Sequence, residues 1–169
     1  MDRQPPFKPC KSSELEAGDL FLCPDRAGSF YGLKVLDAGS DQEFVVLGPD
    51  FSDRIPHPCI RNWSSDLVLS LGKSYCLDLP AEVGAWSDAA ANPPVPMLAV
   101  VDGHYFVRAN GAREIDRFFP CFVELETGRL VERSLSYGTV AYTQQWGLSS
   151  TAPNMPPKSL LLFGRPAKA

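Results

Sequence analysis

The sequence predicts a mainly β protein with little helix. Short segments rich in aromatic and β-branched residues recur along the chain, separated by turns of Gly, Asp, Asn and Pro. No long segment shows a 3.6-residue hydrophobic period, and the 16 prolines oppose long helices because proline lacks the backbone donor. We therefore expect a small SH3-like or open barrel, or two packed antiparallel meanders.

The chain of 169 residues is long enough for one domain that needs neither a disulfide nor a metal to fold. Residues 1–17 are expected to form a flexible arm, because three prolines oppose regular structure there. Residues 18–169 then form a single mainly β domain. A division into two lobes, 18–80 and 97–166, is left open; the Pro-rich segment 81–96 would be the linker.

The first half of the domain opens with a predicted three-stranded meander. Its turns have the residues that turns need, with proline fixing φ in one and glycine allowing positive φ in both. The expected strands are 20–23, 30–36 and 43–47, and the turns are 24–28 and 37–41. Two further strands, 67–71 and 74–79, are expected to pair through the Gly72-Lys73 turn.

A second group of strands follows the Pro-rich segment. Asp102-Gly103 suits the type I′ turn of a tight hairpin, so 97–101 should pair with 104–108. A second hairpin is expected from 118–125 and 129–135. Single strands are expected at 138–144 and 159–163.

The five cysteines occur singly, with no Cys-x-x-Cys and no His-x-x-x-His. We therefore predict no metal site and no cofactor. Strand alternation suggests that Cys23, Cys76 and Cys121 are core residues, whereas Cys59 is the thiol most expected at the surface. A Cys/His catalytic pair would require one of these thiols to meet His57 or His104.

Other polar and aromatic residues are candidates for a functional site. Glu124 and Glu126 lie two apart on a predicted strand and are expected on a solvated face. Trp63 lies in a loop and is a candidate anchor for a protein partner, because tryptophan is enriched at interface hot spots. Trp146 is expected in the core.

Negative charge concentrates in residues 37–53, which contain five acids and no Lys or Arg. Such a surface repels phosphate and attracts basic proteins, so nucleic acid is not the expected partner. No apolar stretch predicts a signal peptide or a membrane span, and a membrane partner is not expected. The predicted partner-binding residues are Asp37, Asp41, Glu43, Asp50, Asp53 and Trp63.

Two stretches of the first meander carry a family resemblance. Gly18-Asp-Leu-Phe-Leu-Cys-Pro and Gly28-Ser-Phe-Tyr-Gly-Leu-Lys-Val-Leu resemble the opening of the Imm26-type immunity proteins of bacterial toxin systems. Ser159-Leu-Leu-Leu-Phe-Gly resembles their closing strand. The match covers residues 17–47, and residues 50–157 depart from the pattern. The resemblance implies a cytoplasmic, non-enzymatic protein that binds and neutralises one cognate toxin.

The charge and the resemblance together favour a basic protein toxin as the partner, bound through a partly acidic surface. Two alternatives stay open at this point. One is a ligand-binding or Cys/His-dependent enzyme on a β-barrel, and the other is a general protein-interaction module of SH3-like shape. The oligomeric state is left open as well.

Overall fold

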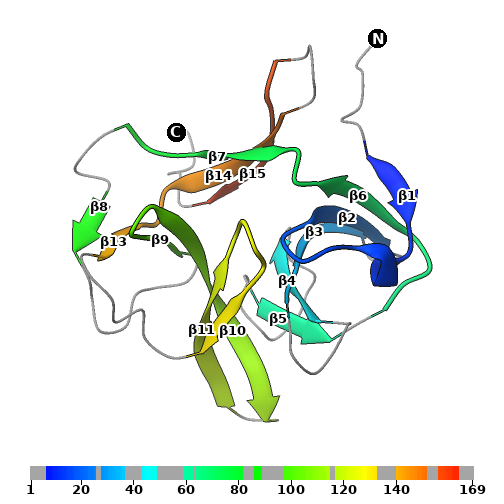
Figure 1. Ribbon diagram of the computed structural model, residues 1–169, viewed down its shortest axis with the longest axis horizontal. Coiled ribbons are helices and arrows are strands. Elements are labelled where there is room, and N and C mark those ends of the chain that lie inside the picture. The colour runs from blue at the N-terminus through cyan, green and yellow to red at the C-terminus, as the bar shows by residue number, and fades with distance from the viewer. Residues whose placement is uncertain are drawn as a thin grey trace.

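The computed structural model confirms a mainly β protein (Figure 1). It describes residues 7–25, 28–36, 43–48, 59–62, 64–81, 86–88, 97–114, 117–132, 140–151 and 156–163. The elements are β1 Lys8–Cys10, η1 Ser12–Glu14, β2 Leu20–Asp25, β3 Gly28–Lys34, β4 Glu43–Gly48, β5 Cys59–Asn62, β6 Val68–Gly72, β7 Tyr75–Asp78, β8 Trp86–Asp88, β9 Met97–Val101, β10 His104–Glu114, β11 Arg117–Glu124, β12 Leu130–Glu132, β13 Val140–Thr143, β14 Trp146–Ser150 and β15 Lys158–Phe163.

Within these residues, most strands belong to one long, open sheet. Its order is β1-β6-β2-β3-β4-β5-β10-β9-β13-β8, with β11 paired to β10 and β12 paired to β11. Its pairs are antiparallel except for a single parallel contact between Cys59 and Asn110, which joins the two halves of the chain. A second sheet, β15-β14-β7, lies across the top of Figure 1.

The three strands of the first meander pair as predicted. β2 runs on to Asp25 and β3 begins at Gly28, so the first turn is shorter than predicted, and the predicted turn 37–41 lies outside the described residues.

The side chains of these strands alternate between two cores. In β2, Leu20 packs in the central hydrophobic cluster, whereas its neighbour Phe21 packs in a cluster on the other face of the sheet. In β4, Val45 packs in the central cluster and Val46 packs in the cluster on the other face. Alternation places successive side chains on opposite faces, so this part of the sheet is covered on both sides.

The second half is built in the same way around the β9–β10 hairpin. Asp102 and Gly103 both have positive φ, 50° and 84°, as the predicted type I′ turn requires. Val107 of β10 packs in the central cluster, and Phe106 packs in a third cluster with Phe122 and Tyr142. The central cluster therefore draws on both halves of the chain, and it includes Trp146, which is only 2% exposed, as predicted.

The structure differs from the sequence-based expectation at the N-terminal arm. Residues 8–10 form β1, which pairs with β6, and Leu15 just after η1 is buried. Pro9 is tolerated because β1 is an outer strand, where a missing donor can face away from the sheet. Part of the predicted linker 81–96 is also regular, because Trp86–Asp88 form β8 on β13.

The predicted hairpin of 67–71 with 74–79 is wrong. β7 follows β6 directly but pairs with β14, about 70 residues further along the chain. Gly72 takes a positive φ of 57°, and Ser74 N–H donates to the Leu71 carbonyl at 3.2 Å, so the chain turns out of the long sheet here. Ser149 Oγ donates to Asp78 Oδ2 at 2.6 Å, which fixes the new partner.

The β11–β12 turn and the start of β2 meet through two glycines. A Cβ on Gly128 would lie 2.5 Å from the Lys34 carbonyl oxygen and 2.6 Å from the Gly18 nitrogen. Both glycines have positive φ, 85° at Gly18 and 68° at Gly128. Backbone hydrogen bonds cross the contact, from Gly18 N–H to the Lys34 carbonyl at 2.9 Å and from Leu36 N–H to the Gly128 carbonyl at 2.7 Å. We call this contact the glycine junction.

Candidate functional site

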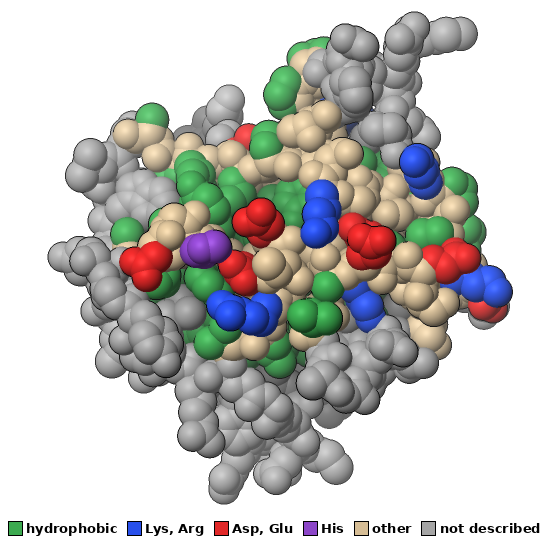
Figure 2. Space-filling model, viewed as in Figure 1, with side chains coloured by type: hydrophobic (Ala, Val, Ile, Leu, Met, Phe, Trp, Pro, Cys, Tyr) green, Lys and Arg blue, Asp and Glu red, His purple; other side chains and the backbone are tan. Residues whose placement is uncertain are grey.

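A groove of about 280 Å³ opens on the face shown in Figure 2, above the glycine junction. Residues from the β6–β7 turn, β7, the β9–β10 turn, the start of β10 and the β11–β12 turn line it. They are Lys73, Tyr75, Cys76, Leu77, Gly103, His104, Tyr105, Leu125 and Glu126. Segments distant in sequence thus meet around one opening, which we call the β7 groove.

The β7 groove runs along an edge of β7. Successive side chains of a strand point to opposite faces of its sheet, so a cavity on one face would touch alternate residues. The groove instead touches the three consecutive residues Tyr75, Cys76 and Leu77, and none of its lining residues comes from β14. In the part of the chain that the structure describes, β14 is the strand that pairs with β7.

The register of β7 on β14 shows which backbone groups face this edge. Thr151 N–H donates to the Ser74 carbonyl at 3.0 Å, and the pairing continues with Tyr75 opposite Ser150. Hydrogen-bonded and non-hydrogen-bonded pairs alternate in an antiparallel ladder. The backbone N–H and C=O groups of Cys76 therefore point toward β14, and those of Tyr75 and Leu77 point away from it.

Tyr75 fixes the floor of the β7 groove. Its hydroxyl lies 2.8 Å from the Leu125 carbonyl and 3.0 Å from the Gly18 carbonyl, and its one proton can be donated to either. Burial raises the pKa of Tyr75 well above its usual range, and the nearby carboxylates of Asp19 and Glu126 raise it further. The hydroxyl therefore stays protonated and ties β7 to the glycine junction.

Charged side chains lie beside the apolar part of the groove, and Figure 2 shows acidic and basic groups interspersed across this face of the molecule. Burial raises the pKa of Asp19, and Lys73, which is close enough to act on this carboxyl, lowers it. Glu126 is exposed on the rim. No ion pair of Glu126 occurs among the described residues. The lining itself carries one basic side chain, Lys73, and one acidic side chain, Glu126. Asp19 lies outside the lining but acts on Lys73, so two acidic side chains stand against one basic side chain around this end of the groove.

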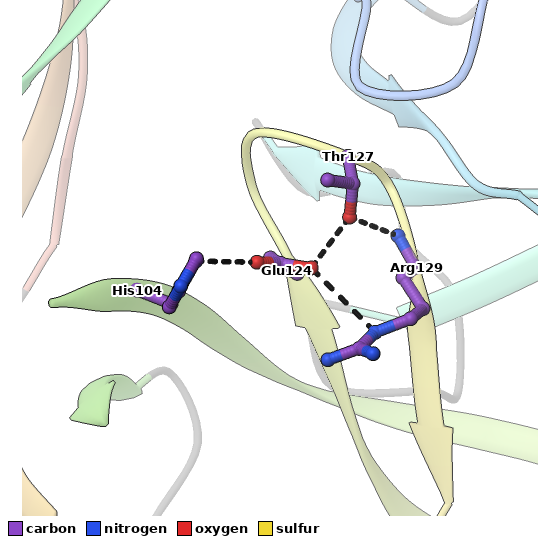
Figure 3. A network of polar contacts seen from close by, with 4 residues as sticks. All are labelled: His104, Glu124, Thr127 and Arg129. Carbon is purple, nitrogen blue, oxygen red and sulfur yellow. Dashed lines mark hydrogen bonds and ion pairs between the residues drawn. The ribbon is translucent and has the colours of Figure 1, made fainter. Parts of the chain in front are cut away.

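One wall of the groove is held by a buried carboxylate (Figure 3). Glu124 is only 5% exposed; its Oε1 accepts from His104 Nδ1 at 2.8 Å, and its Oε2 accepts from Thr127 Oγ1 at 2.6 Å. Arg129 Nε lies 3.6 Å from Oε2. The predicted solvated position is therefore wrong for Glu124, because β10 and the β11–β12 turn cover it, whereas Glu126 is exposed as predicted.

Cys76 and His104 both line the β7 groove, and Glu124 orients the imidazole. Cys76 and His104 are therefore the described residues on which the Cys/His catalytic alternative can be examined. Burial raises the pKa of the Cys76 thiol, and Asp78 raises it further. A catalytic thiol needs the opposite shift, because the thiolate is the nucleophile.

We expect the alkylation of Cys76 by iodoacetamide to be slow near neutral pH. Its pKa lies above the ordinary value of about 8.5, so the rate should keep rising at a pH where the rate of glutathione has levelled off. Peptide mass spectrometry on a pH series measures this, and Cys76→Ser identifies the signal. A rate that reaches its plateau near pH 7 would instead support catalysis.

Most of the predicted partner-binding residues lie outside the described residues. These are Asp37, Asp41, Asp50, Asp53 and Trp63, and His57 lies outside them too. The backbone of Glu43 begins β4 opposite Asn62, and that of Cys59 begins β5; their side chains are not described. Cys23 and Cys121 are buried, as predicted, whereas Cys76 is half-buried at the groove.

Sequence reasoning did not find the β7 groove. Its lining comes from three turns and from two strands, β7 and β10, and β7 takes its place there by pairing with β14. All three turns, 72–73, 102–103 and 126–128, are visible in the sequence as turns, but nothing local places them side by side. In the described part of the chain, no group of three or more His, Cys, Asp or Glu could hold a metal ion.

No family model, curated protein or solved structure matches this chain. Among the described residues, no helix has the length and apolar character of a membrane-crossing segment.

Proposed function

We propose that this protein binds a cognate protein toxin in the bacterial cytoplasm and neutralises it. The observation that carries the proposal is the β7 groove, an open groove with an acidic residue on its rim, beside a strand edge that no other described strand pairs with. Unpaired edges and mixed polar and apolar surfaces are the features that bind other chains. The resemblance of residues 17–47 to Imm26-type immunity proteins names the class of partner.

The negative charge of this chain supports a toxin with a basic surface as the partner. The chain has a net charge of −4, and the acidic stretch 37–53 holds no Lys or Arg. Complementary charge speeds the encounter of two proteins and excludes partners of like charge. A toxin with a basic cleft would therefore be captured quickly, before it reaches its target.

Reversal of the acidic stretch is expected to slow association with the toxin by about tenfold or more at low salt, with a smaller effect on dissociation. The variant carries Lys in place of Asp37, Asp41, Glu43, Asp50 and Asp53. The partner to use is a toxin identified among the products of the genes that neighbour this chain's gene, and surface plasmon resonance against it measures both rates. Raising the salt concentration provides the control, because screening should shrink the difference. An unchanged association rate would contradict the electrostatic part of the proposal.

Co-expression tests the function itself. Cells that produce the neighbouring toxin should grow only when this chain is present, and the two proteins should co-elute as a complex. Continued growth arrest with both proteins expressed and folded would overturn the proposed function.

A further inference from the structure

We infer that the β7 groove binds an extended, basic segment of the partner, which adds to the three-stranded sheet as a fourth strand beside β7. The inference rests on the proposed function for the identity of the partner as a toxin. The mode of binding rests on the edge of β7, on the lining of the groove and on its charge.

The edge of β7 offers the backbone groups that an added strand needs. Tyr75 and Leu77 each present an N–H and a C=O away from β14, two residues apart, which is the repeat of an antiparallel ladder. Strand addition of this kind gains affinity from main-chain hydrogen bonds and specificity from pockets for alternate side chains.

The lining of the groove provides contacts for those side chains. Leu77 and Tyr105 are half-buried and pack against the central cluster, and Leu125 beside them is buried. An apolar side chain of the added segment would lie against them. Gly103 at the β9–β10 turn has no atom within 4 Å of its missing Cβ, which leaves room on that side of the groove.

The charge of the rim selects a basic segment. Glu126 is exposed and lines the groove, and Asp102 is exposed in the β9–β10 turn beside Gly103. Lys73 carries the opposite charge but interacts with Asp19. A Lys or Arg of the added strand would pair with Glu126, and an acidic segment would be repelled.

A displayed library of random linear peptides tests the inference with the full-length protein. The expected binders alternate apolar residues with others that include Lys or Arg. Methylation of the peptide backbone at every second nitrogen should abolish binding in one register and spare it in the other, because only alternate N–H groups face β7. Glu126→Lys should weaken binding by about tenfold, and Asp66→Lys, at an exposed acid outside the lining, should not.

Leu77→Pro removes one outward N–H and places a proline ring at the edge; we expect it to weaken peptide and toxin binding by at least about tenfold. Leu162→Pro is the matched control. Leu162 of β15 lies opposite Gly147 of β14, and the backbone groups of Gly147 point toward β7. Leu162 is therefore a non-hydrogen-bonded partner, and its N–H points away from β14, at the other edge of the sheet. Since Leu77→Pro could unfold the sheet, the methylated peptides test the same pairing on the unaltered protein.

The possible results separate the inference from the proposed function. Toxin binding that is unchanged in Leu77→Pro, with no library peptide sensitive to backbone methylation, overturns strand addition and leaves the function standing. Methylation-sensitive peptides without protection from the toxin support the groove and overturn the function. A concentration-dependent dimer that Leu77→Pro dissociates would show that a second copy of this chain occupies the edge, which overturns the inference.

Discussion

Gly128→Ala is expected to destabilise the protein by about 3–5 kcal/mol, a large part of the roughly 5–15 kcal/mol typical of a folded domain. The new Cβ would lie 2.5 Å from the Lys34 carbonyl oxygen and 2.6 Å from the Gly18 nitrogen, so the two backbones must separate. Separation weakens the two hydrogen bonds of the glycine junction, each worth about 1 kcal/mol. The positive φ adds about 1–2 kcal/mol of strain for alanine.

Gly103→Ala is the control for the glycine junction. Gly103 has a similar positive φ, 84°, but no atom lies within 4 Å of the position of its missing Cβ. Gly103→Ala should therefore lower the free energy of unfolding only by the backbone strain of alanine at positive φ, about 1–2 kcal/mol. Urea denaturation, read by tryptophan fluorescence, measures both variants. Equal losses in the two variants would contradict a close backbone contact at Gly128.

The second large effect is expected at Phe21: Phe21→Ala should lower the free energy of unfolding by about 3–5 kcal/mol. Phe21 has no exposed surface, and its ring meets those of Phe30 and Phe44 edge-on, with centroids 6.4 and 5.6 Å away. The ring covers Gly32 on the neighbouring strand, where a Cβ would lie 2.3 Å from the ring. The packed rings of Phe30 and Phe44 keep the Phe21 ring from moving aside. Gly32→Ala alone should therefore lower the free energy of unfolding by about 1–3 kcal/mol.

The two substitutions should compensate each other. In the Phe21→Ala background the new Cβ at Gly32 enters the space that the ring has left, so the double variant should be more stable than the sum of the single losses by about 1–2 kcal/mol. Denaturation of all four proteins in the cycle measures this coupling. Phe21→Ala combined with Gly103→Ala provides an additive reference. A coupling near zero for the first pair would show that the ring does not rest on Gly32.

Local signals predicted the parts of the fold that local sequence determines. The β2–β3–β4 meander and the β9–β10 hairpin follow from strand alternation and from turn residues such as Asp102-Gly103. The β11–β12 hairpin was predicted too. In each case the paired strands are adjacent in sequence, so the turn between them sets the register.

The errors concern contacts between segments distant in sequence. Residues 74–79 carry no signal that they leave their neighbour β6 and pair with β14. The buried position of Glu124 depends on His104 of β10 and on Arg129 beyond the turn, which local alternation does not reveal. The β7 groove is a product of these same distant contacts, so the sequence predicted several of its turns but not the groove.

The proposed function combines evidence from the two levels. The acidic stretch 37–53 and the resemblance of residues 17–47 come from the sequence. The edge of β7, unpaired within the described part of the chain, and the rim of the groove come from the fold. Both support the proposal that this protein binds another protein chain, and the raised pKa of the Cys76 thiol opposes the catalytic alternative at the same groove.

Amide hydrogen exchange read by NMR tests strand addition at the β7 groove most directly. In complex with a library-selected basic peptide, and then with the toxin, the amides of Tyr75 and Leu77 should exchange at least about tenfold more slowly, because each becomes hydrogen-bonded. The amide of Leu162, at the other edge of the same sheet, should be unaffected. Unchanged exchange at Tyr75 and Leu77, or equal slowing at Leu162, would contradict the account.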